Sequence, residues 1–177
     1  VYFPLLVKKG VEIGIDKDKM KQGVLGGLDA MVKNDGSVAN ETVFWRFFEQ
    51  ATGVSVESVK DTFDDFYNNE FLMLKDVCEY TEFSRKIIDV LKEKGYKLIL
   101  ATNPILPLSA NINRMAFVGL KPDDFDYITS FENSTYCKPN PKYYEEIIEK
   151  NNLNPNECLM VGNNVLEDMI AEKLGVE

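Results

Sequence analysis

The segment Lys97-Leu98-Ile99-Leu100-Ala101-Thr102-Asn103 decides the fold of this chain. Its apolar run predicts a buried strand over 96–102, because a strand covered on both faces reads as a continuous apolar stretch. Thr102 and Asn103 end that strand, and Pro104 then takes the chain out of the ladder. Ligands of open α/β sheets bind outside the carboxyl ends of the strands. The Thr102 hydroxyl and the Asn103 backbone N–H are therefore candidate groups for holding a phosphoryl oxygen.

The second part of the chain, from about residue 81, alternates between helical and strand patterns. A second buried strand is expected over 157–161 and a short strand over 127–131. Strands that alternate with helices indicate a parallel sheet with helical crossovers, so the predicted fold class is α/β. The helices expected in this part cover 83–94 (closed by Gly95), 108–117, 142–150 and 166–174.

Residues 1–80 show helical periodicity and no strand pattern. The aromatic cluster 44–48 predicts a hydrophobic core between these helices, from which Trp45 is the candidate to face a cleft. The four helices are expected over 2–9 up to Gly10, over 18–33, from an N-cap at Asn40, and from an N-cap at Ser55 through Phe71.

Composition excludes several classes of function. A net charge of −9 argues against nucleic acid as a partner, and no apolar stretch reaches the roughly 20 residues that cross a bilayer. Histidine is absent, which excludes Ser-His-Asp and Cys-His catalysis. Carboxylates, lysine, hydroxyls, thiols or a cofactor must then do any chemistry. A cytoplasmic location is expected because the three cysteines are widely spaced, without a disulfide or zinc pattern: Cys78, Cys137 and Cys158.

Two further segments place polar groups beside the predicted sheet. Lys138 lies in Tyr136-Cys137-Lys138-Pro139, where a cation can offset the charge on a transferring phosphoryl group. The run 159–164, Leu-Met-Val-Gly-Asn-Asn, precedes Asp168. Asn164 and Asp168 are spaced to meet at the mouth of this turn. They are candidate oxygen ligands for Mg²⁺, which usually takes one or two carboxylates in proteins.

These three segments, in this order, resemble motifs II, III and IV of the haloacid dehalogenase-like (HAD) superfamily. The helical residues 1–80 lie where that family inserts a C1-type helical cap, and 81–177 resemble part of its α/β core. The resemblance implies a Rossmann-like parallel sheet, an aspartate nucleophile, a second aspartate as acid and base, and Mg²⁺. The implied activity is that of a Mg-dependent phosphatase, which hydrolyses a small phosphorylated metabolite through an aspartyl-phosphate.

The resemblance also assigns roles to individual residues. Thr102 and Asn103 would bind the phosphoryl group, and Lys138 would stabilise it. Asp168, with Asn164, would hold the metal. Asn163-Asn164 departs from the family, which commonly has an aspartate at one of these positions. An amide oxygen can coordinate Mg²⁺ but brings no charge.

The first motif of the family, an Asp-x-Asp after a strand, is not found at its expected place. The early Asp16-Lys17-Asp18 follows Gly14-Ile15, and we interpret it as the start of a helix. We expect the nucleophile upstream of Val1, and the first and last strands of the core outside these 177 residues. The alternative is a short chain whose small sheet is completed by a partner.

Two other functions stay open. A dehalogenase-type hydrolase works without a metal, and Asn163-Asn164 would position its water. It needs an arginine for the substrate carboxylate, and Arg46, Arg85 and Arg114 show no obvious place for one. The second alternative is a non-catalytic HAD-like binding protein. The acidic run 123–126 is interpreted as a solvated turn or helix start.

Overall fold

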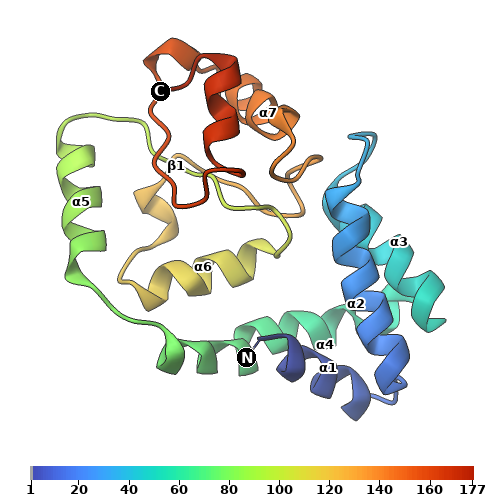
Figure 1. The fold of residues 1–177 in the computed structure, drawn as a ribbon. Helices are drawn as coiled ribbons and strands as arrows, with labels where there is room; N and C mark the ends of the chain where they lie inside the picture. The colour runs from blue at the N-terminus through green and yellow to red at the C-terminus, as the bar shows by residue number, and fades with distance from the viewer. Residues whose placement is uncertain (1) are drawn as a thin grey trace.

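A computed structural model describes residues 2–177, which form a largely helical α/β structure with one small parallel sheet. Residues 2–80 contain helices joined by loops and are called the helical half below. Residues 81–177 carry the sheet and are called the α/β half (Figure 1). Within the described residues, no helix is both long and apolar enough to span a bilayer.

The helical half consists of four α-helices and a 3₁₀ segment. The pair α2 and α3 packs closely because glycines on α2 face aromatic rings on α3: a Cβ at Gly27 would lie 2.6 Å from the Phe44 ring. The bounds are α1 Tyr2–Glu12, α2 Lys17–Val32, α3 Asn40–Thr52, α4 Val56–Asn68 and η1 Glu70–Val77.

Gly10 does not end the first helix, contrary to the prediction. The helix α1 continues to Glu12, and a Cβ at Gly10 would lie 2.5 Å from the Met20 sulfur. Glycine is needed there for close contact between α1 and α2. The turn comes at Gly14, whose φ of +92° suits a residue without a side chain.

The prediction that Asn40 caps α3 is also wrong. The N-cap is Ala39, and the first free N–H groups of α3 are bonded by Ser134 and Phe131 carbonyls of the α/β half, at 2.9 and 2.8 Å. Asn40 is instead buried within the first turn, where its amide nitrogen donates to the Pro104 carbonyl at 3.3 Å and contacts the Cys137 sulfur at 3.4 Å. This one side chain joins the two halves.

The N-cap position of α4 is Ser55 as predicted, but its hydroxyl makes no capping bond. A Glu49 carboxylate oxygen accepts the Val56 N–H at 2.7 Å instead. The helix ends at Asn68, and Phe71 belongs to the 3₁₀ segment η1. The expected continuous helix through Phe71 is therefore corrected to two elements.

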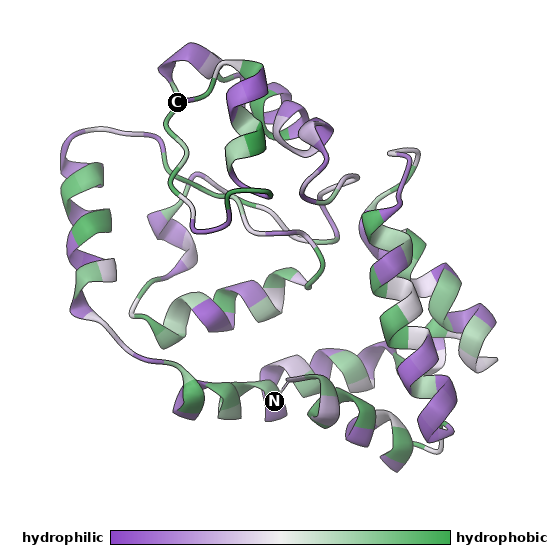
Figure 2. Cartoon of the chain, viewed as in Figure 1, coloured by the Kyte–Doolittle hydropathy of each residue, from purple (hydrophilic) through white to green (hydrophobic). Residues whose placement is uncertain are grey.

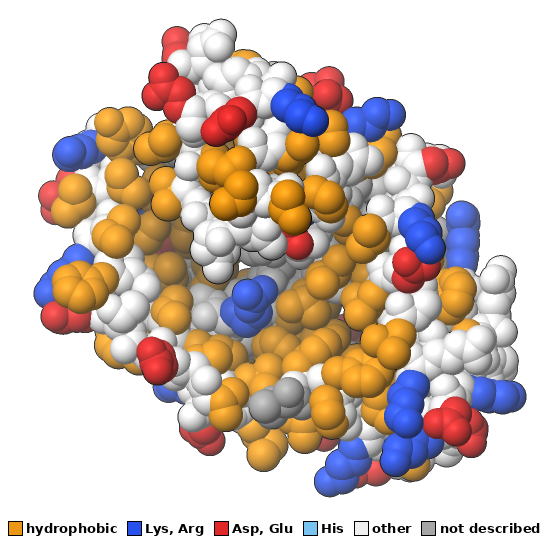
Figure 3. All heavy atoms as spheres, in the orientation of Figure 1, with side chains coloured by type: hydrophobic (Ala, Val, Ile, Leu, Met, Phe, Trp, Pro, Cys, Tyr) orange, Lys and Arg blue, Asp and Glu red, His pale blue; other side chains and the backbone are white. Residues whose placement is uncertain are grey.

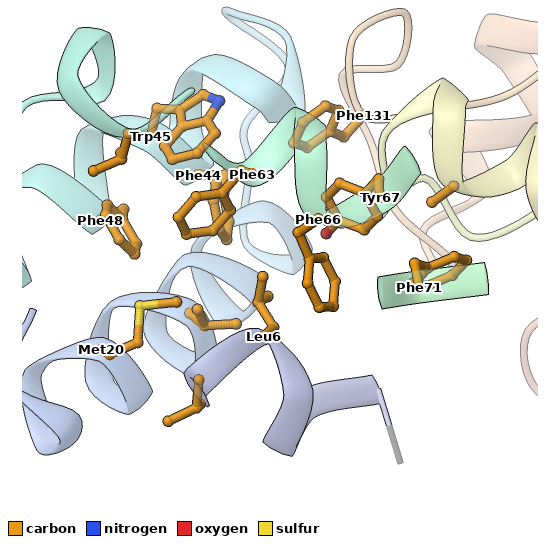
Figure 4. Close-up of a cluster of buried hydrophobic side chains, with 14 of the residues drawn as sticks. Leu6, Met20, Phe44, Trp45, Phe48, Phe63, Phe66, Tyr67, Phe71 and Phe131 are labelled. Atoms are coloured by element: carbon orange, nitrogen blue, oxygen red, sulfur yellow. The ribbon is translucent and has the colours of Figure 1, made fainter. Parts of the chain in front are cut away.

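The aromatic cluster is the core of the helical half, as predicted (Figure 4). Phe48 is fully buried and meets Trp45 and Phe63 edge to face, with ring centroids 5.5 and 5.4 Å apart. Such pairs add to the stabilisation that burial of the rings provides. Phe131, from the α/β half, also packs against Phe44.

The α/β half has a sheet of two short parallel strands, with Ile99 opposite Tyr127 and Leu100 opposite Ile128. The element bounds are α5 Glu82–Glu93, β1 Ile99–Leu100, α6 Leu108–Phe117, η2 Pro122–Asp124, β2 Tyr127–Ile128, α7 Pro141–Asn151, η3 Pro155–Glu157 and η4 Met169–Leu174.

Both predicted buried strands are corrected by the structure. The segment 96–102 shortens to the half-buried β1, and 157–161 is not a strand. Beyond local turn bonds, its backbone is hydrogen-bonded to Glu177, and Val161 is 83% exposed. An apolar segment forms a ladder only beside a partner, and the second edge of β1 has none among the described residues. Likewise the predicted helix 166–174 is a 3₁₀ helix that begins at Met169.

The helix α5 forms where expected but buries no residue. Its apolar side chains form one stripe, yet Phe83 is 65% exposed and Ile87 56%. Figure 2 shows the hydrophobic colour along α5, and Figure 1 shows the helix standing apart from α6 and α7. The acidic run 123–126 begins in the 3₁₀ segment η2, and it is not solvated throughout as predicted, because Asp124 is buried and bonded to Arg85 and Lys92.

Candidate active site

The five residues singled out from the sequence line one open cavity of about 740 Å³. They come from three places in the chain: the residues after β1, the loop before α7, and the turn before η4. Every residue that lines this cavity belongs to the α/β half, and Figure 3 shows a hollow in the surface with a basic side chain in view. The five are Thr102, Asn103, Lys138, Asn164 and Asp168.

Lys138 and Asp168 form a buried ion pair at the wall of this cavity. The Lys138 ammonium lies 2.5 Å from an Asp168 carboxylate oxygen, and the residues are 6% and 5% exposed. The Tyr143 and Tyr144 rings lie 5.7 and 5.5 Å from the ammonium. A buried charge is costly without its partner, so the pair fixes the position of the Lys138 side chain.

Asp168 is held by the turn that precedes it. Its second carboxylate oxygen accepts the backbone N–H groups of Asn163 and Asn164, both at 3.0 Å. Burial raises the pKa of Asp168, but the hydrogen bonds from Lys138 and from the Asn164 N–H outweigh it, and the net pKa lies below the usual 3.8. Gly162 permits this arrangement, because a Cβ there would overlap the carboxylate.

The segment after β1 is held by hydrogen bonds from residues that the sequence pattern did not single out. The Thr102 carbonyl accepts hydrogen bonds from the Thr129 hydroxyl at 2.8 Å and the Tyr143 hydroxyl at 2.7 Å. Burial raises the pKa of Tyr143 well above its usual value, so its hydroxyl remains a donor. The Asn103 side-chain oxygen accepts the Lys138 N–H at 3.2 Å, which joins two of the three site segments.

The described residues alone do not supply a divalent metal site. Asp168 already receives the Lys138 ammonium and two N–H groups, and a carboxylate has about four lone-pair positions. The Asn164 side-chain oxygen accepts the Leu166 and Glu167 N–H groups. In the described part of the chain, no three Asp, Glu or Cys residues gather as a metal site. A metal here needs oxygen ligands from elsewhere.

Arg114 is a further residue of this cavity, which it reaches from α6. The sequence pattern assigned no arginine to the site, because the orientation of α6 depends on tertiary packing. Arg85, by contrast, is bonded to Asp89 and Asp124 outside the cavity. Asp16 is likewise elsewhere: it is the N-cap of α2, as interpreted from the sequence, and accepts the Asp18 and Lys19 N–H groups at 3.0 Å.

The fold and this lysine–carboxylate cavity define an α/β protein with a built polar site. A family model described as haloacid dehalogenase-like hydrolase matches residues 7–173. The chain therefore belongs to the haloacid dehalogenase-like hydrolases, as its three motifs indicated. No curated protein matches the sequence.

Proposed function

We propose that the protein is a phosphoric monoester hydrolase, which acts on a small phosphorylated metabolite through an aspartyl-phosphate. One observation carries the proposal: the Thr102 hydroxyl, the Asn103 N–H and the Lys138 ammonium belong to residues of a single cavity. A cation and fixed donors that meet in one cavity stabilise negative charge on a transferring phosphoryl group. The buried Lys138–Asp168 pair supports the role of Lys138, because it needs no rearrangement before reaction.

In the proposed mechanism, a carboxylate oxygen attacks phosphorus and the ester P–O bond breaks. The leaving alkoxide takes a proton from a second carboxylic acid, and water then hydrolyses the aspartyl-phosphate. Thr102 and Asn103 orient the phosphoryl oxygens, and Lys138 offsets their charge. The helical half acts as a cap over the cavity and excludes water.

The nucleophile, in this proposal, comes from a strand outside residues 1–177. Support comes from the edge of β1 that no strand among residues 2–177 pairs with, and from the exposed apolar side chains of Leu159 and Val161. A parallel strand beside β1 would end at the same edge of the sheet as Thr102. An aspartate there would lie at the cavity. Mg²⁺, which the family resemblance implies, would depend on carboxylates of that same segment, so no step above is assigned to it.

The test is phosphate release from p-nitrophenyl phosphate by the full-length protein, with and without Mg²⁺. Lys138→Ala should lower kcat by two to four orders of magnitude. The control Lys142→Ala removes the same charge from an exposed side chain nearby and should leave kcat unchanged. Lys138→Ala leaves the buried Asp168 carboxylate without its partner, so the Tm of the variant is measured to check folding. A Lys138→Met/Asp168→Asn variant removes both charges. Normal turnover by either Lys138 variant would overturn the assignment.

A second candidate function is dehalogenation of a 2-halocarboxylate, and Arg114 is the observation that favours it. This arginine lines the cavity, and no ion pair engages it within residues 2–177. It is placed to hold a substrate carboxylate, which the phosphatase does not require. Metal-independent release of chloride from 2-chloropropionate, lost in Arg114→Gln, would favour this function over the first. Release of neither phosphate nor chloride would leave a non-catalytic binding protein.

A further inference from the structure

A second cavity, of about 270 Å³, lies between the two halves. Aromatic side chains contribute to its wall from both sides, together with aliphatic and polar ones: Phe44, Trp45, Phe63 and Tyr67 of the helical half and Phe131 of the α/β half. Ile105 lines this cavity and also the candidate active site, so the two spaces adjoin. None of the five candidate site residues lines it, which makes it a separate binding space.

One buried polar group in this wall has no partner. Trp45 is 8% exposed, and among the described residues its indole Nε1–H makes no hydrogen bond. In Figure 4 the nitrogen lies on the edge of the ring nearer Phe131. A buried donor that makes no hydrogen bond lowers the stability of the folded state, so buried N–H groups usually have partners. The other unpartnered buried atoms belong to residues that do not line this cavity.

Apart from the Ser109 hydroxyl, the remaining polar side chains of the wall are engaged with protein groups. The Tyr2 and Tyr67 hydroxyls bond to each other at 2.7 Å, and burial raises the pKa of Tyr67 well above its usual value. Lys60 pairs with Glu41 and lies 3.9 Å from Asp64. Glu132 accepts the Leu108 N–H. Two wall carboxylates against one wall cation disfavour an anionic ligand.

We propose that this cavity binds a neutral aromatic ring with one hydrogen-bond acceptor, and that the Trp45 indole N–H donates to that acceptor. The volume exceeds that of a roughly 150 Å³ cavity known to hold benzene, so one substituted ring fits. Edge-to-face contacts with the wall rings favour an aromatic occupant. The identity of this ring as the organic part of the substrate rests on the proposed function. Binding itself does not.

The chain has a single tryptophan, so its indole N–H gives one resonance in a ¹H–¹⁵N NMR spectrum. The probes are benzyl methyl ether, which has an acceptor, and propylbenzene, which has the same size and none. The ether should move the indole proton downfield and bind roughly threefold to tenfold tighter than the hydrocarbon. Equal shifts and equal affinities for both probes, or no binding of either, would overturn the proposal.

Variants separate the hydrogen bond from the cavity. Trp45→Phe keeps an aromatic ring in the wall but removes the indole N–H. The variant should therefore bind both probes equally, as measured by saturation-transfer NMR. Leu28→Phe fills the cavity and should abolish binding, whereas the control Leu25→Phe changes an exposed site on the same helix and should not. Retained preference for the ether in Trp45→Phe would contradict the proposal. These measurements need no turnover, so probe binding without phosphate release would refute the phosphatase alone.

Discussion

The two halves of this molecule treat their apolar residues differently. The helical half encloses most of its aromatic side chains in one core, in which Phe48 and Phe66 are fully buried. The α/β half leaves apolar side chains of similar size exposed, on α5 and in residues 159–166. Helices bury their faces against each other locally, whereas a sheet is completed only by neighbouring strands. Local packing between helices therefore closes the core of the helical half, whereas a sheet of two short strands leaves apolar side chains of the α/β half exposed.

The difference in burial between the two halves is tested most directly by removing one aromatic ring from each half. Phe48→Ala should destabilise the protein by about 3–5 kcal/mol, because it leaves a cavity in a closed core. Phe83→Ala on the exposed face of α5 should change stability by less than about 0.5 kcal/mol. Urea unfolding measures both. Equal losses would show that α5 is buried in solution, and a large loss at Phe83 would point to a partner on that face.

A smaller effect is expected from Gly162→Ala in the candidate site. The new Cβ overlaps the Asp168 carboxylate, so the turn must shift and the Lys138–Asp168 pair must loosen. We expect a loss of about 1–3 kcal/mol in unfolding free energy together with reduced turnover. Asn163→Ala, in the same turn, keeps the backbone N–H and serves as the control. A stable and fully active Gly162→Ala variant would argue against this geometry.

The loss of folding stability at acid pH should depend on Asp124. Burial raises the pKa of Asp124, but the bond from Arg85 and the Lys121 N–H lower it to about 2, against 3.8 when unpaired. A depressed pKa gives stability that is present above about pH 4 and is lost as the pH falls toward 2. Asp124→Asn should cost about 1–2 kcal/mol at pH 7 and reduce that loss at acid pH. Parallel pH–stability curves for both proteins would contradict this.

The smallest effect is expected at the start of α4. Ser55→Ala should cost well under about 0.5 kcal/mol, because its hydroxyl makes no capping bond. Glu49→Ala should cost more, since the Glu49 carboxylate accepts the Val56 N–H. Thermal unfolding of the two variants compares them directly. A larger loss for Ser55→Ala would restore the capping role that the sequence predicted.

Local and tertiary signals explain what could be predicted from the sequence. Helices such as α2 and α7 were expected nearly at their observed bounds, because their bonds are local and their ends carry caps or Pro141. The strands were not, because pairing depends on neighbours. Asn40 was misassigned as an N-cap because the groups that bond the start of α3 come from Phe131 and Ser134, far along the chain.

The candidate site was assembled from the sequence because each polar residue follows an apolar stretch. The bonds that the Asp168 oxygens make to Lys138 and to the turn were not foreseen, and the role of Asp168 as a metal ligand stays a prediction. Arg114 shows the same limit. The side to which a helical residue turns depends on packing between helices, which periodicity does not specify beyond one apolar face.

The buried amide of Asn40 has a mechanical consequence. It contacts Pro104 and Cys137, which are the chain neighbours of Asn103 and Lys138. The first turn of α3 is thus anchored one residue away from both loops of the candidate site. A rotation of the helical half about this point would therefore displace those two loops least. Asn40 thus has the position of a hinge point that lies next to the candidate site.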